Sequence, residues 1–290
     1  MSKHRDDHAA RPVAFVTGSS SGFGLLTSVS LARSGYLVMA TMRDTDKRHE
    51  LLRQASAHGV SESIRVLEMD VTDRRAALEA VSSVIEQYGA IDVLVNNAGF
   101  AVGGVVEEIE MDAWRSQMET NVFGLIAVTK SVLPSMRERG KGLIVNIGSI
   151  SGRIGFPGYA PYAASKFAVE GFSEALRLEM LPFGVHVVLI EPGAYNTAIW
   201  EKGFDQIRSR PDSPYRPVLQ AVLRYSRKTA SEASDPQEVA DLIVRLAKDP
   251  APRLRYTLGK GNRISLLGKT LLPWKWFERI VMNMLKSLSK

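Results

Sequence analysis

Tyr162 and Lys166 are the two side chains of this sequence whose types and spacing best suit proton transfer. They stand four residues apart, so on a helix they lie on the same face. A free tyrosine has a pKa of about 10, too high for a base near neutral pH. A positive charge about 4 Å away contributes roughly 4 kcal/mol at an effective dielectric constant of 20, enough to lower a pKa by about three units. The pair is therefore able in principle to exchange protons near pH 7, although this spacing also occurs in ordinary pairs on helix surfaces.

A glycine-rich turn near the N-terminus is the second chemical feature. Residues 17–24 read TGSSSGFG, which sets Gly18, Gly22 and Gly24 in a G-x-x-x-G-x-G pattern between a predicted strand and a predicted helix. Glycine lets the backbone approach a pyrophosphate closely, and a helix N-terminus adds unpaired N–H groups with roughly half a positive charge. Glycine also marks ordinary turns, so this turn alone is weak evidence.

These residues need a scaffold, and the hydrophobic pattern predicts an α/β fold. Short β-branched runs alternate with amphipathic stretches, as in βαβ units. The runs are almost wholly apolar, which is typical of a parallel sheet covered by helices on both faces. Right-handed crossovers then give a Rossmann-like, doubly wound sheet of about seven strands. Strands are predicted at 13–17, 36–41, 64–69, 91–95, 143–147, 185–190 and 255–258, and helices at 25–33, 74–88, 112–137, 162–181 and after the cap at 234–238.

Other motifs share this order and spacing. They are Asp70-Val71, Asn96-Asn97-Ala98-Gly99, Asn121, Ser149, Tyr162-Ala-Ala-Ser-Lys166 and Pro192-Gly193. Together with the glycine turn, over residues 13–197, the sequence resembles the short-chain dehydrogenase/reductase family in its single-domain form. Each motif is modest evidence, whereas all of them in register leave little room for chance.

The resemblance implies catalytic roles for four residues. Tyr162 would be the general acid in reduction and the general base in oxidation. Ser149 would hold the substrate oxygen, with Ser151 as a nearby competitor whose spacing to Tyr162 fits the family less well. Lys166 would also bind the nicotinamide ribose, and Asn121 would help to position a water and lysine proton relay.

The resemblance also implies contacts to a nicotinamide cofactor. Asp70 and Val71 would flank the adenine, Pro192-Gly193 would lie near the nicotinamide, and Thr197 would bond the carboxamide or the pyrophosphate. The turn at residues 96–99 is about as suited to supporting the sheet as to touching the cofactor. The predicted cofactor contacts are Gly18, Ser20, Ser21, Gly22, Phe23, Gly24, Arg43, Asp70, Val71, Asn97, Ala98, Gly99, Tyr162, Lys166, Pro192, Gly193 and Thr197.

The end of the second predicted strand indicates which nicotinamide is used. An acid there favours the ribose hydroxyl of NAD, and an arginine favours the 2′-phosphate of NADP. Met42 occupies the position aligned with the acid, and Arg43 follows it, with a guanidinium that matches a phosphate bidentately. Asp44 lies further into the loop, where it can cap the next helix. The sequence favours NADP over NAD, and an alignment shifted by two residues would reverse that preference.

Composition excludes several classes of site and partner. The chain has 290 residues, no cysteine and a formal net charge of +6. Without cysteine there is no disulfide, thiolate metal site or cysteine nucleophile, and no histidine cluster suggests a metal. No basic stripe interleaved with aromatics suggests nucleic acid, and no apolar run reaches the roughly 18 residues of a membrane span. We expect a cytoplasmic protein, and, from the family resemblance, a homodimer or homotetramer.

The domain prediction is a flexible leader at 1–12, one catalytic domain at 13–261 and an amphipathic extension at 262–290. Within the domain, residues 194–233 turn polar and irregular, which predicts a substrate lid loop containing Ile199, Trp200, Phe204 and Tyr215. The extension is basic with a tryptophan-rich apolar stripe. Such a helix can make peripheral membrane contact, pack on its own domain, cover a substrate or enter a partner subunit.

The lid and extension resemble those of family members that act on retinoids, steroids and other bulky apolar compounds. We therefore expect an NADP(H)-dependent oxidoreductase that interconverts a hydrophobic alcohol and its ketone or aldehyde. A catalytically silent NADP(H)-binding sensor or scaffold is the alternative from another class, although its signature would be a degenerate tyrosine or lysine. An epimerase or dehydratase on the same fold usually carries a larger substrate domain than 290 residues allow.

Overall fold

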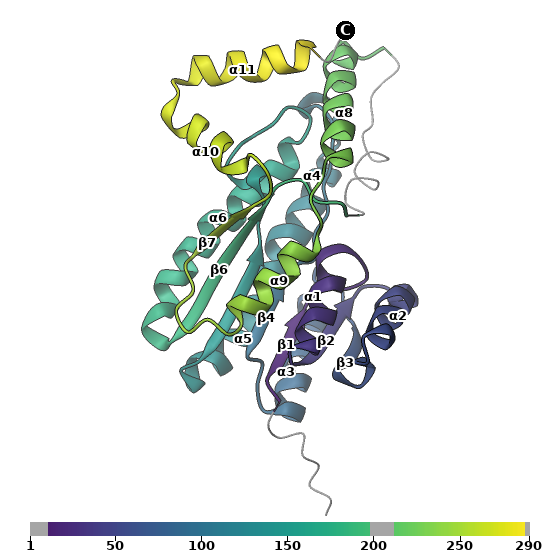
Figure 1. Ribbon diagram of the computed structural model, residues 1–290, viewed down its shortest axis with the longest axis vertical. Helices are drawn as coiled ribbons and strands as arrows, with labels where there is room; N and C mark the ends of the chain where they lie inside the picture. Colours follow the sequence, from purple (N-terminus) through teal and green to yellow (C-terminus); the bar gives the residue numbers. More distant parts are fainter. Residues whose placement is uncertain (1–10, 198–211, 288–290) are drawn as a thin grey trace, which may run out of the picture.

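A parallel sheet of seven strands forms the centre of the computed structural model, which describes residues 11–197 and 212–287 (Figure 1). Its order is β3-β2-β1-β4-β5-β6-β7, and every neighbouring pair is parallel. The predicted doubly wound sheet is confirmed. The strands are β1 (Val13–Val16), β2 (Leu37–Met42), β3 (Ile64–Glu68), β4 (Val93–Asn96), β5 (Gly142–Ile147), β6 (Val185–Pro192) and β7 (Arg255–Leu258).

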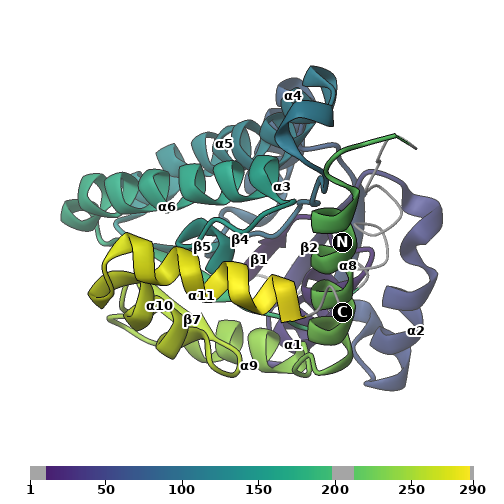
Figure 2. The same ribbon diagram turned by 90° about the horizontal axis from the view of Figure 1, so that it is seen from above.

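Two layers of helices cover the sheet, as Figure 2 shows from above. One layer holds α3 (Arg74–Tyr88), α5 (Leu125–Arg139) and α6 (Ala160–Met180); the other holds α1 (Gly22–Arg33) and α9 (Gln237–Leu246). Alternate residues of each strand face opposite layers, so Phe15 and Val16 enter separate apolar clusters, each fully buried. This double burial is the reason why the strands are apolar throughout.

The strand order reverses at β1, which lies between β2 and β4. The segments that leave the carboxyl ends of β1 and β4 therefore run in opposite directions, and a crevice opens between them. Because all strands are parallel, the turns after β1, β4, β5 and β6 meet at one edge of the sheet. The predicted catalytic and cofactor motifs lie at this edge.

The long helix predicted at 112–137 is not continuous. It consists of α4 (Met111–Met118), a π-helical turn at Glu119–Gly124 and α5. An extra residue in the turn rotates the following helix relative to the preceding one, a device often found at functional sites. Asn121 lies in this turn, and hydrophobic periodicity alone gives no sign of the inserted residue.

The predicted lid loop also differs, because α8 (Arg216–Ser231) occupies part of it. Its charged residues made the segment read as irregular, whereas Leu219, Val222 and Ser226 are buried at helical spacing. Ile199, Trp200 and Phe204 lie outside the described residues, as does most of the predicted leader. The helix expected after Asp44, for which the sequence gave no bounds, is α2 (His49–Ala57).

The C-terminal extension forms two helices, α10 (Asn262–Leu271) and α11 (Trp274–Ser287). Leu272 is extended ahead of Pro273, as residues before proline usually are, and this ends α10. From there α11 crosses towards α8 (Figure 1). Leu285 is buried against Ala221 and Val222, so the extension packs back on the protein along this contact.

Candidate active site

Close packing makes the glycine turn after β1 intolerant of side chains. Gly18 and Gly22 have φ values of 68° and 57°, in the left-handed region that favours glycine. A Cβ on Gly18 would lie 2.8 Å from the Cα of Ala98, and one on Gly24 would lie 2.4 Å from the carbonyl oxygen of Gly18. The turn is therefore pressed against both the start of α1 and the turn after β4.

Asn97 and Thr17 hold the turns after β1 and β4 together. The Asn97 Nδ2 donates to the carbonyl oxygens of Thr17 and Gly18, at 2.9 and 3.0 Å. The Thr17 hydroxyl accepts from the backbone N–H groups of Asn97 and Ala98, at 2.9 and 3.0 Å. The sequence left two roles open for the turn at residues 96–99, support of the sheet and contact with the cofactor. The side-chain contacts of Asn97 support the neighbouring turn.

The N-terminus of α1 has the features of an anion site. Its first turn contains no acidic residue, and the side chain of the N-cap residue Ser21 makes no capping hydrogen bond. A hollow of about 240 Å³ opens beside it, lined among others by Ser21, Gly22 and Thr197. Ser20 is half-buried beside it, and Phe23 packs edge-on against Tyr195, with ring centroids 5.4 Å apart. An uncapped helix start below a glycine turn fits the pyrophosphate of a dinucleotide.

The end of β2 presents Arg43 to solvent. Met42 is buried in the core, so the first side chain free to face a ligand in this loop is Arg43, which makes no hydrogen bond or ion pair with the described residues. The Asp44 carboxylate accepts from the Asp46 N–H at 3.0 Å and pairs with Lys47 at 2.9 Å. Asp44 thus caps the following turn, as the sequence suggested, and these bonds hold the pKa of its carboxyl below the usual value.

Asp70 and Val71 follow β3 on the same edge of the sheet. The Asp70 Oδ1 accepts from both the N–H and the hydroxyl of Thr72, at 2.9 and 2.8 Å. Val71 is buried against Gly124 of the π-helical turn, where an added Cβ would lie 2.8 Å from the Val71 Cγ2. This contact brings the predicted adenine-binding residues beside the turn that carries Asn121.

Asn121 is almost wholly buried and fully engaged. Its Oδ1 accepts from the Phe100 N–H at 3.1 Å, and its Nδ2 donates to the Phe100 carbonyl at 3.0 Å and the Ser165 hydroxyl at 3.1 Å. An added Cβ on Gly99 would lie 3.1 Å from the same Oδ1. The side chain thus joins the turn after β4 to α6, one residue before Lys166.

Tyr162, Lys166 and Ser149 come together beside this turn. The Lys166 Nζ is buried, donates to the Ile147 carbonyl at 2.7 Å and lies 5.7 Å from the centre of the Tyr162 ring. Ser149 follows β5 and its hydroxyl accepts from the Ser151 N–H at 3.1 Å. The Ser149 side chain also hydrogen-bonds Tyr162, so the serine that follows β5 lies beside the tyrosine.

The pKa of Tyr162 differs from the sequence-based expectation. A neighbouring lysine was expected to lower it towards 7, but burial raises it above its usual value, and the Ser149 side chain only opposes this rise. The lysine lies beside the ring and does not offset the loss of solvation. Burial also lowers the pKa of Lys166 to about 8, a shift that Glu170 opposes. At neutral pH both side chains therefore carry their protons.

Pro192 ends β6, and Gly193 after it meets the C-terminal extension. The Gly193 N–H donates to the Leu258 carbonyl at 3.1 Å, and an added Cβ would overlap the Asn262 amide at 1.9 Å. Asn262 donates to the same carbonyl at 2.6 Å. Sequence analysis did not anticipate Asn262, which begins α10 and brings the extension to the predicted nicotinamide end of the site.

A buried acid was also missed by the sequence analysis. Glu191 closes the apolar run of β6 and is fully buried, with Arg153 and Arg255 against it. An acid directly after the apolar run at 187–190 was the available signal. Its partners lie 38 and 64 residues away, on segments with no shared pattern.

Comparisons with known proteins agree with this arrangement. The family model for short chain dehydrogenases matches residues 12–208. The chain is 48% identical over 280 residues to the uncharacterized oxidoreductase YusZ of Bacillus subtilis, covering 96% of this chain and 99% of that protein. It is 38% identical over 251 residues to the 17-beta-hydroxysteroid dehydrogenase type 1 of Mus musculus, covering 84% and 72% of the two chains.

A solved structure, ElxO with NADP bound, matches with a TM-score of 0.73 and 26% identity, covering 88% of this chain and 99% of that one. The family model spans well over half of the sequence, and it includes the glycine turn and the tyrosine–lysine pair. The chain belongs to the short-chain dehydrogenase family of oxidoreductases.

Proposed function

We propose that this protein is an NADP(H)-dependent oxidoreductase that interconverts a hydrophobic alcohol and its ketone or aldehyde, with Tyr162 as the acid and base. One observation carries the proposal: Tyr162, Lys166 and Ser149 converge at the edge of the sheet where the glycine turn leaves an uncapped helix start. A carbonyl bound there would meet a proton donor beside a cofactor site.

Tyr162 suits the proton-donating step. Because its pKa is raised, the phenol is protonated at neutral pH and can donate to the substrate oxygen as that oxygen gains charge. The Ser149 hydroxyl would hold the same oxygen, and the Lys166 ammonium would stabilise the phenolate left behind. NADPH, when bound, supplies the hydride for the carbonyl carbon. In oxidation the same groups act in reverse, with Tyr162 accepting the alcohol proton.

The residues that follow β2 favour NADP over NAD. Arg43 is exposed and carries the charge that a 2′-phosphate requires, whereas Asp44 is occupied by its own turn. Gly18, Gly22 and the uncapped start of α1 would hold the pyrophosphate. The NADP in the related ElxO structure supports the same choice.

A hydrophobic substrate is supported by the residues around Tyr159, three positions before Tyr162. Tyr159 and Phe156 pack with Ala221 and Val222 of α8 and with α11 in one apolar cluster. The Phe156 ring lies 5.0 Å from that of Tyr225 on α8. This apolar cluster begins at Tyr159, about one helical turn before Tyr162, and contains few polar groups, which favours apolar ligands. The resemblance to a hydroxysteroid dehydrogenase is consistent with it.

The experiment is to follow oxidation of NADPH and of NADH with a panel of apolar ketones, aldehydes and quinones and small polar controls. We expect turnover with NADPH on apolar carbonyls. Tight binding of NADPH without turnover on any member would favour the sensor alternative, and turnover confined to the polar controls would refute the hydrophobic-substrate proposal.

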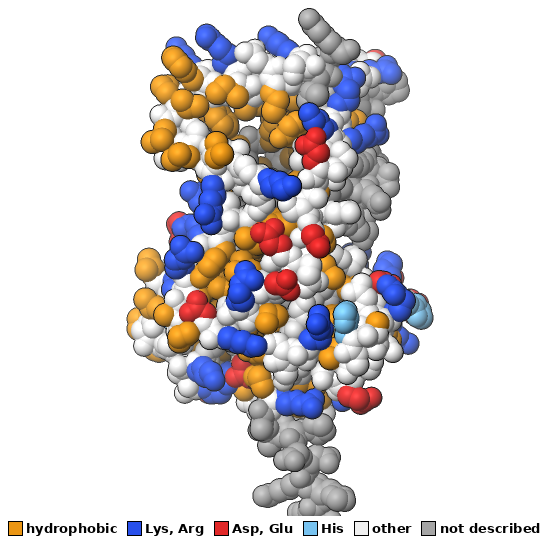
Figure 3. All heavy atoms as spheres, in the orientation of Figure 1, with side chains coloured by type: hydrophobic (Ala, Val, Ile, Leu, Met, Phe, Trp, Pro, Cys, Tyr) orange, Lys and Arg blue, Asp and Glu red, His pale blue; other side chains and the backbone are white. Residues whose placement is uncertain are grey.

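The C-terminal helices further support peripheral contact with an anionic lipid surface. Exposed apolar side chains gather on α10 and α11, and Figure 3 shows them at the upper left, bordered by basic residues. They include Ile264, Leu267, Leu271, Trp274, Trp276 and Ile280, all more than half exposed. Tryptophan beside lysine and arginine suits the interface of an anionic bilayer. None of the described helices is long and apolar enough to cross a membrane.

Co-sedimentation with vesicles tests this contact. We expect binding to vesicles of phosphatidylglycerol and phosphatidylcholine, weaker binding to phosphatidylcholine alone, and loss on replacing Trp274 and Trp276 by serine. Equal binding of that variant would refute the lipid contact.

We also expect a homodimer or homotetramer, with exposed Phe123 and Phe167 buried between copies. A monomer in sedimentation equilibrium would contradict this expectation.

A further inference from the structure

A short turn carries Ser149 away from β5 and brings its side chain to the catalytic tyrosine. We call residues 149–153 the serine turn. The Gly152 N–H donates to the Ser149 carbonyl at 2.8 Å, and the next N–H, that of Arg153, donates to the Ile150 carbonyl at 3.0 Å. Because these bonds close the turn tightly, a displacement of Arg153 is passed on to Ser149.

The serine turn packs against the helix that carries the catalytic lysine. A Cβ added to Gly152 would lie 2.8 Å from the Lys166 carbonyl oxygen and 3.0 Å from the Glu170 Cγ. Residue 152 therefore has to be glycine for the turn to lie this close to α6. The distance between the Ser149 hydroxyl and the catalytic helix depends on how firmly the turn is held there.

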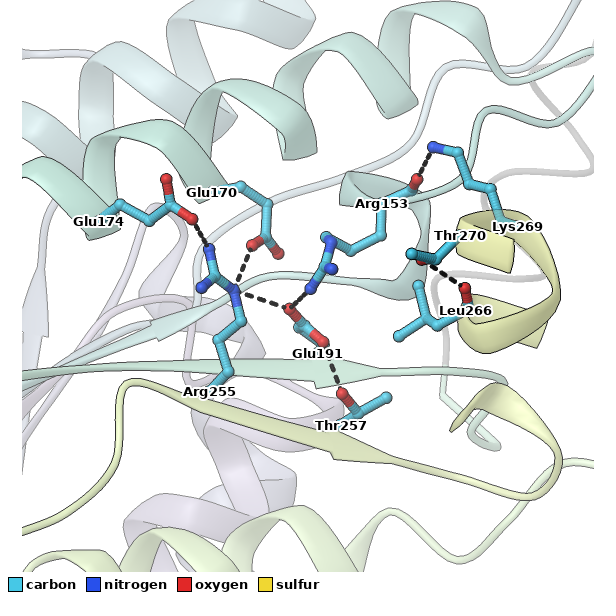
Figure 4. A network of polar contacts seen from close by, with 9 residues as sticks. All are labelled: Arg153, Glu170, Glu174, Glu191, Arg255, Thr257, Leu266, Lys269 and Thr270. Atoms are coloured by element: carbon cyan, nitrogen blue, oxygen red, sulfur yellow. Dashed lines mark hydrogen bonds and ion pairs between the residues drawn. The ribbon is translucent and has the colours of Figure 1, made fainter. Parts of the chain in front are cut away.

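The side chain of Arg153 ties the serine turn to the sheet (Figure 4). Its guanidinium pairs with the Glu191 Oε1 at 3.1 Å. Glu191 is fully buried, pairs also with Arg255 at 3.3 Å and accepts from the Thr257 hydroxyl at 2.6 Å. A buried charge is tolerated when it is paired and hydrogen-bonded, and Glu191 satisfies both conditions. It is a fixed anchor for the Arg153 side chain.

Helix α10 binds the same residue through its backbone. Figure 4 shows the Lys269 side chain reaching from α10 to the Arg153 carbonyl oxygen, to which its ammonium donates. The same Nζ lies 5.2 Å from the centre of the Phe167 ring, and Phe167 follows the catalytic lysine on α6. One ammonium thus bridges the serine turn and the catalytic helix, through a charge-assisted hydrogen bond and a cation–π contact.

Two cations meet at the serine turn, and Glu191 makes this arrangement favourable. Burial lowers the pKa of Lys269, and the nearby Arg153 guanidinium lowers it further. The ion pair with Glu191 offsets the charge of Arg153, so a second positive charge is accommodated beside it. The contact of α10 with the serine turn is therefore supported by the ion pair behind it.

The start of α10 is fixed independently of Lys269. Asn262, its first residue, donates to the Leu258 carbonyl at 2.6 Å and lies where a Cβ on Gly193 would be. Lys269 follows Asn262 by seven residues, or about two turns, so both side chains lie on one face of the helix. That face extends from the predicted nicotinamide end of the site to the serine turn.

We propose that Lys269 is a positioning residue for Ser149, and that α10 is thereby part of the active site. Its ammonium holds the serine turn against α6, which keeps the Ser149 hydroxyl in place to bind the oxygen of a carbonyl substrate. Lys269 touches neither substrate nor cofactor and acts through Arg153. The proposal rests on the proposed function in so far as Ser149 holds that oxygen.

Replacing Lys269 with methionine in the full-length chain tests the kinetic consequence. Methionine keeps much of the length of the side chain and removes the ammonium. With NADPH and a carbonyl that the wild type reduces, kcat should fall roughly tenfold, because small errors in the position of a catalytic group are costly. The Kd for NADPH should stay unchanged. Lys269→Arg keeps a charged donor and should restore kcat towards the wild-type value.

Arg263→Met is the matched control. Arg263 lies on the same helix, and its loss changes the net charge equally. Its side chain is exposed and makes no ion pair with the described residues. This variant should therefore keep the kcat of the wild type.

Hydrogen exchange at the serine turn gives a readout that needs no turnover. Mass spectrometry of peptides that cover residues 149–154 follows the Gly152 and Arg153 amides, and a peptide from α2 is the internal reference. In Lys269→Met, exchange at the turn should be about fivefold faster, as for the loss of one hydrogen bond, with the reference unchanged. Lys269→Arg and Arg263→Met should exchange as the wild type does.

An unchanged exchange rate or an unchanged kcat in Lys269→Met would overturn the proposal, as would an equal effect in Arg263→Met. Faster exchange of the α2 peptide to the same extent would indicate a general loss of stability and would also overturn it. A wild-type chain that reduces no carbonyl would refute the proposed function, and the exchange measurement would still judge whether Lys269 holds the serine turn.

Discussion

Replacing Arg43 with alanine should weaken binding of NADPH and leave binding of NADH almost unchanged. Arg43 is exposed just after β2, where Met42 is buried and Asp44 is held by Asp46 and Lys47. The guanidinium is therefore the first charged group after β2 that makes no ion pair with the described residues, and it is available to a 2′-phosphate. NADH lacks that phosphate, so it provides the internal control.

The magnitude follows from the exposure of the site. A hydrogen bond to a charged group contributes about 1.5–3 kcal/mol, equivalent to roughly 10–150-fold in Kd. Solvent and salt screen an exposed pair, so the lower end applies at physiological ionic strength. We expect about a tenfold increase in the Kd for NADPH at 0.15 M salt, and a larger one at lower salt.

Fluorescence titration of NADPH and NADH at two salt concentrations measures this effect. Arg48→Ala is the matched control, because Arg48 is exposed in the same segment, at the end of the turn Thr45–Arg48, and its loss changes the net charge equally. Equal weakening of both cofactors by Arg43→Ala, or an equal effect of Arg48→Ala, would refute the assignment of Arg43 to the phosphate.

Three further variants probe the scaffold and the buried lysine. Gly24→Ala should lower the thermal midpoint, because its Cβ would lie 2.4 Å from the Gly18 carbonyl oxygen. Gly171→Ala in α6 is the control and should leave the midpoint unchanged, because its Cβ would meet nothing within 4 Å. Equal midpoints in the two variants would contradict the packing argument. Asn97→Ala should lower both the thermal midpoint and NADPH affinity, through loss of its bonds to the glycine turn; unchanged affinity in a folded variant would show that these bonds do not shape the cofactor site. The pKa of Lys166 in the folded protein, about 8, lies below its value in the unfolded chain. The free energy of unfolding of the wild type should therefore rise between pH 8 and 10, by up to ~3 kcal/mol more than that of Lys166→Met. Urea unfolding across this pH range measures both proteins, and parallel pH curves for the two would contradict this prediction.

Features that depend on local pattern could be predicted from the sequence. The apolar strands and the turn glycines indicated the sheet and its ligand edge, and the four-residue spacing of Tyr162 and Lys166 indicated a shared helix face. The seventh strand at residues 255–258 was predicted with its bounds unchanged. Each of these follows from residue type and near-neighbour periodicity.

Features that depend on distant contacts could not. The π-helical turn around Asn121 is set by its bonds to Phe100 and Ser165, 21 and 44 residues away. The sequence of α8 looks polar, and its apolar face is recognised only from the packing of that face against α11. The raised pKa of Tyr162 reflects burial, which spacing to a lysine does not report. The ion pairs of Glu170 and Glu191 join four segments of the chain, namely the turn at Arg153, α6, β6 and β7. No pattern within one of these segments predicts its contact with the others.

The most direct test of the central claim is the turnover of Tyr162→Phe with NADPH and a carbonyl that the wild-type chain reduces. Tyr36→Phe is the control, because it also removes a buried phenol, one that donates to the Ala247 carbonyl at 3.0 Å on the α1 side of the sheet. We expect kcat to fall by about 10²–10⁴-fold in Tyr162→Phe with NADPH binding retained, and to stay near wild type in Tyr36→Phe. Undiminished turnover in Tyr162→Phe would contradict the account.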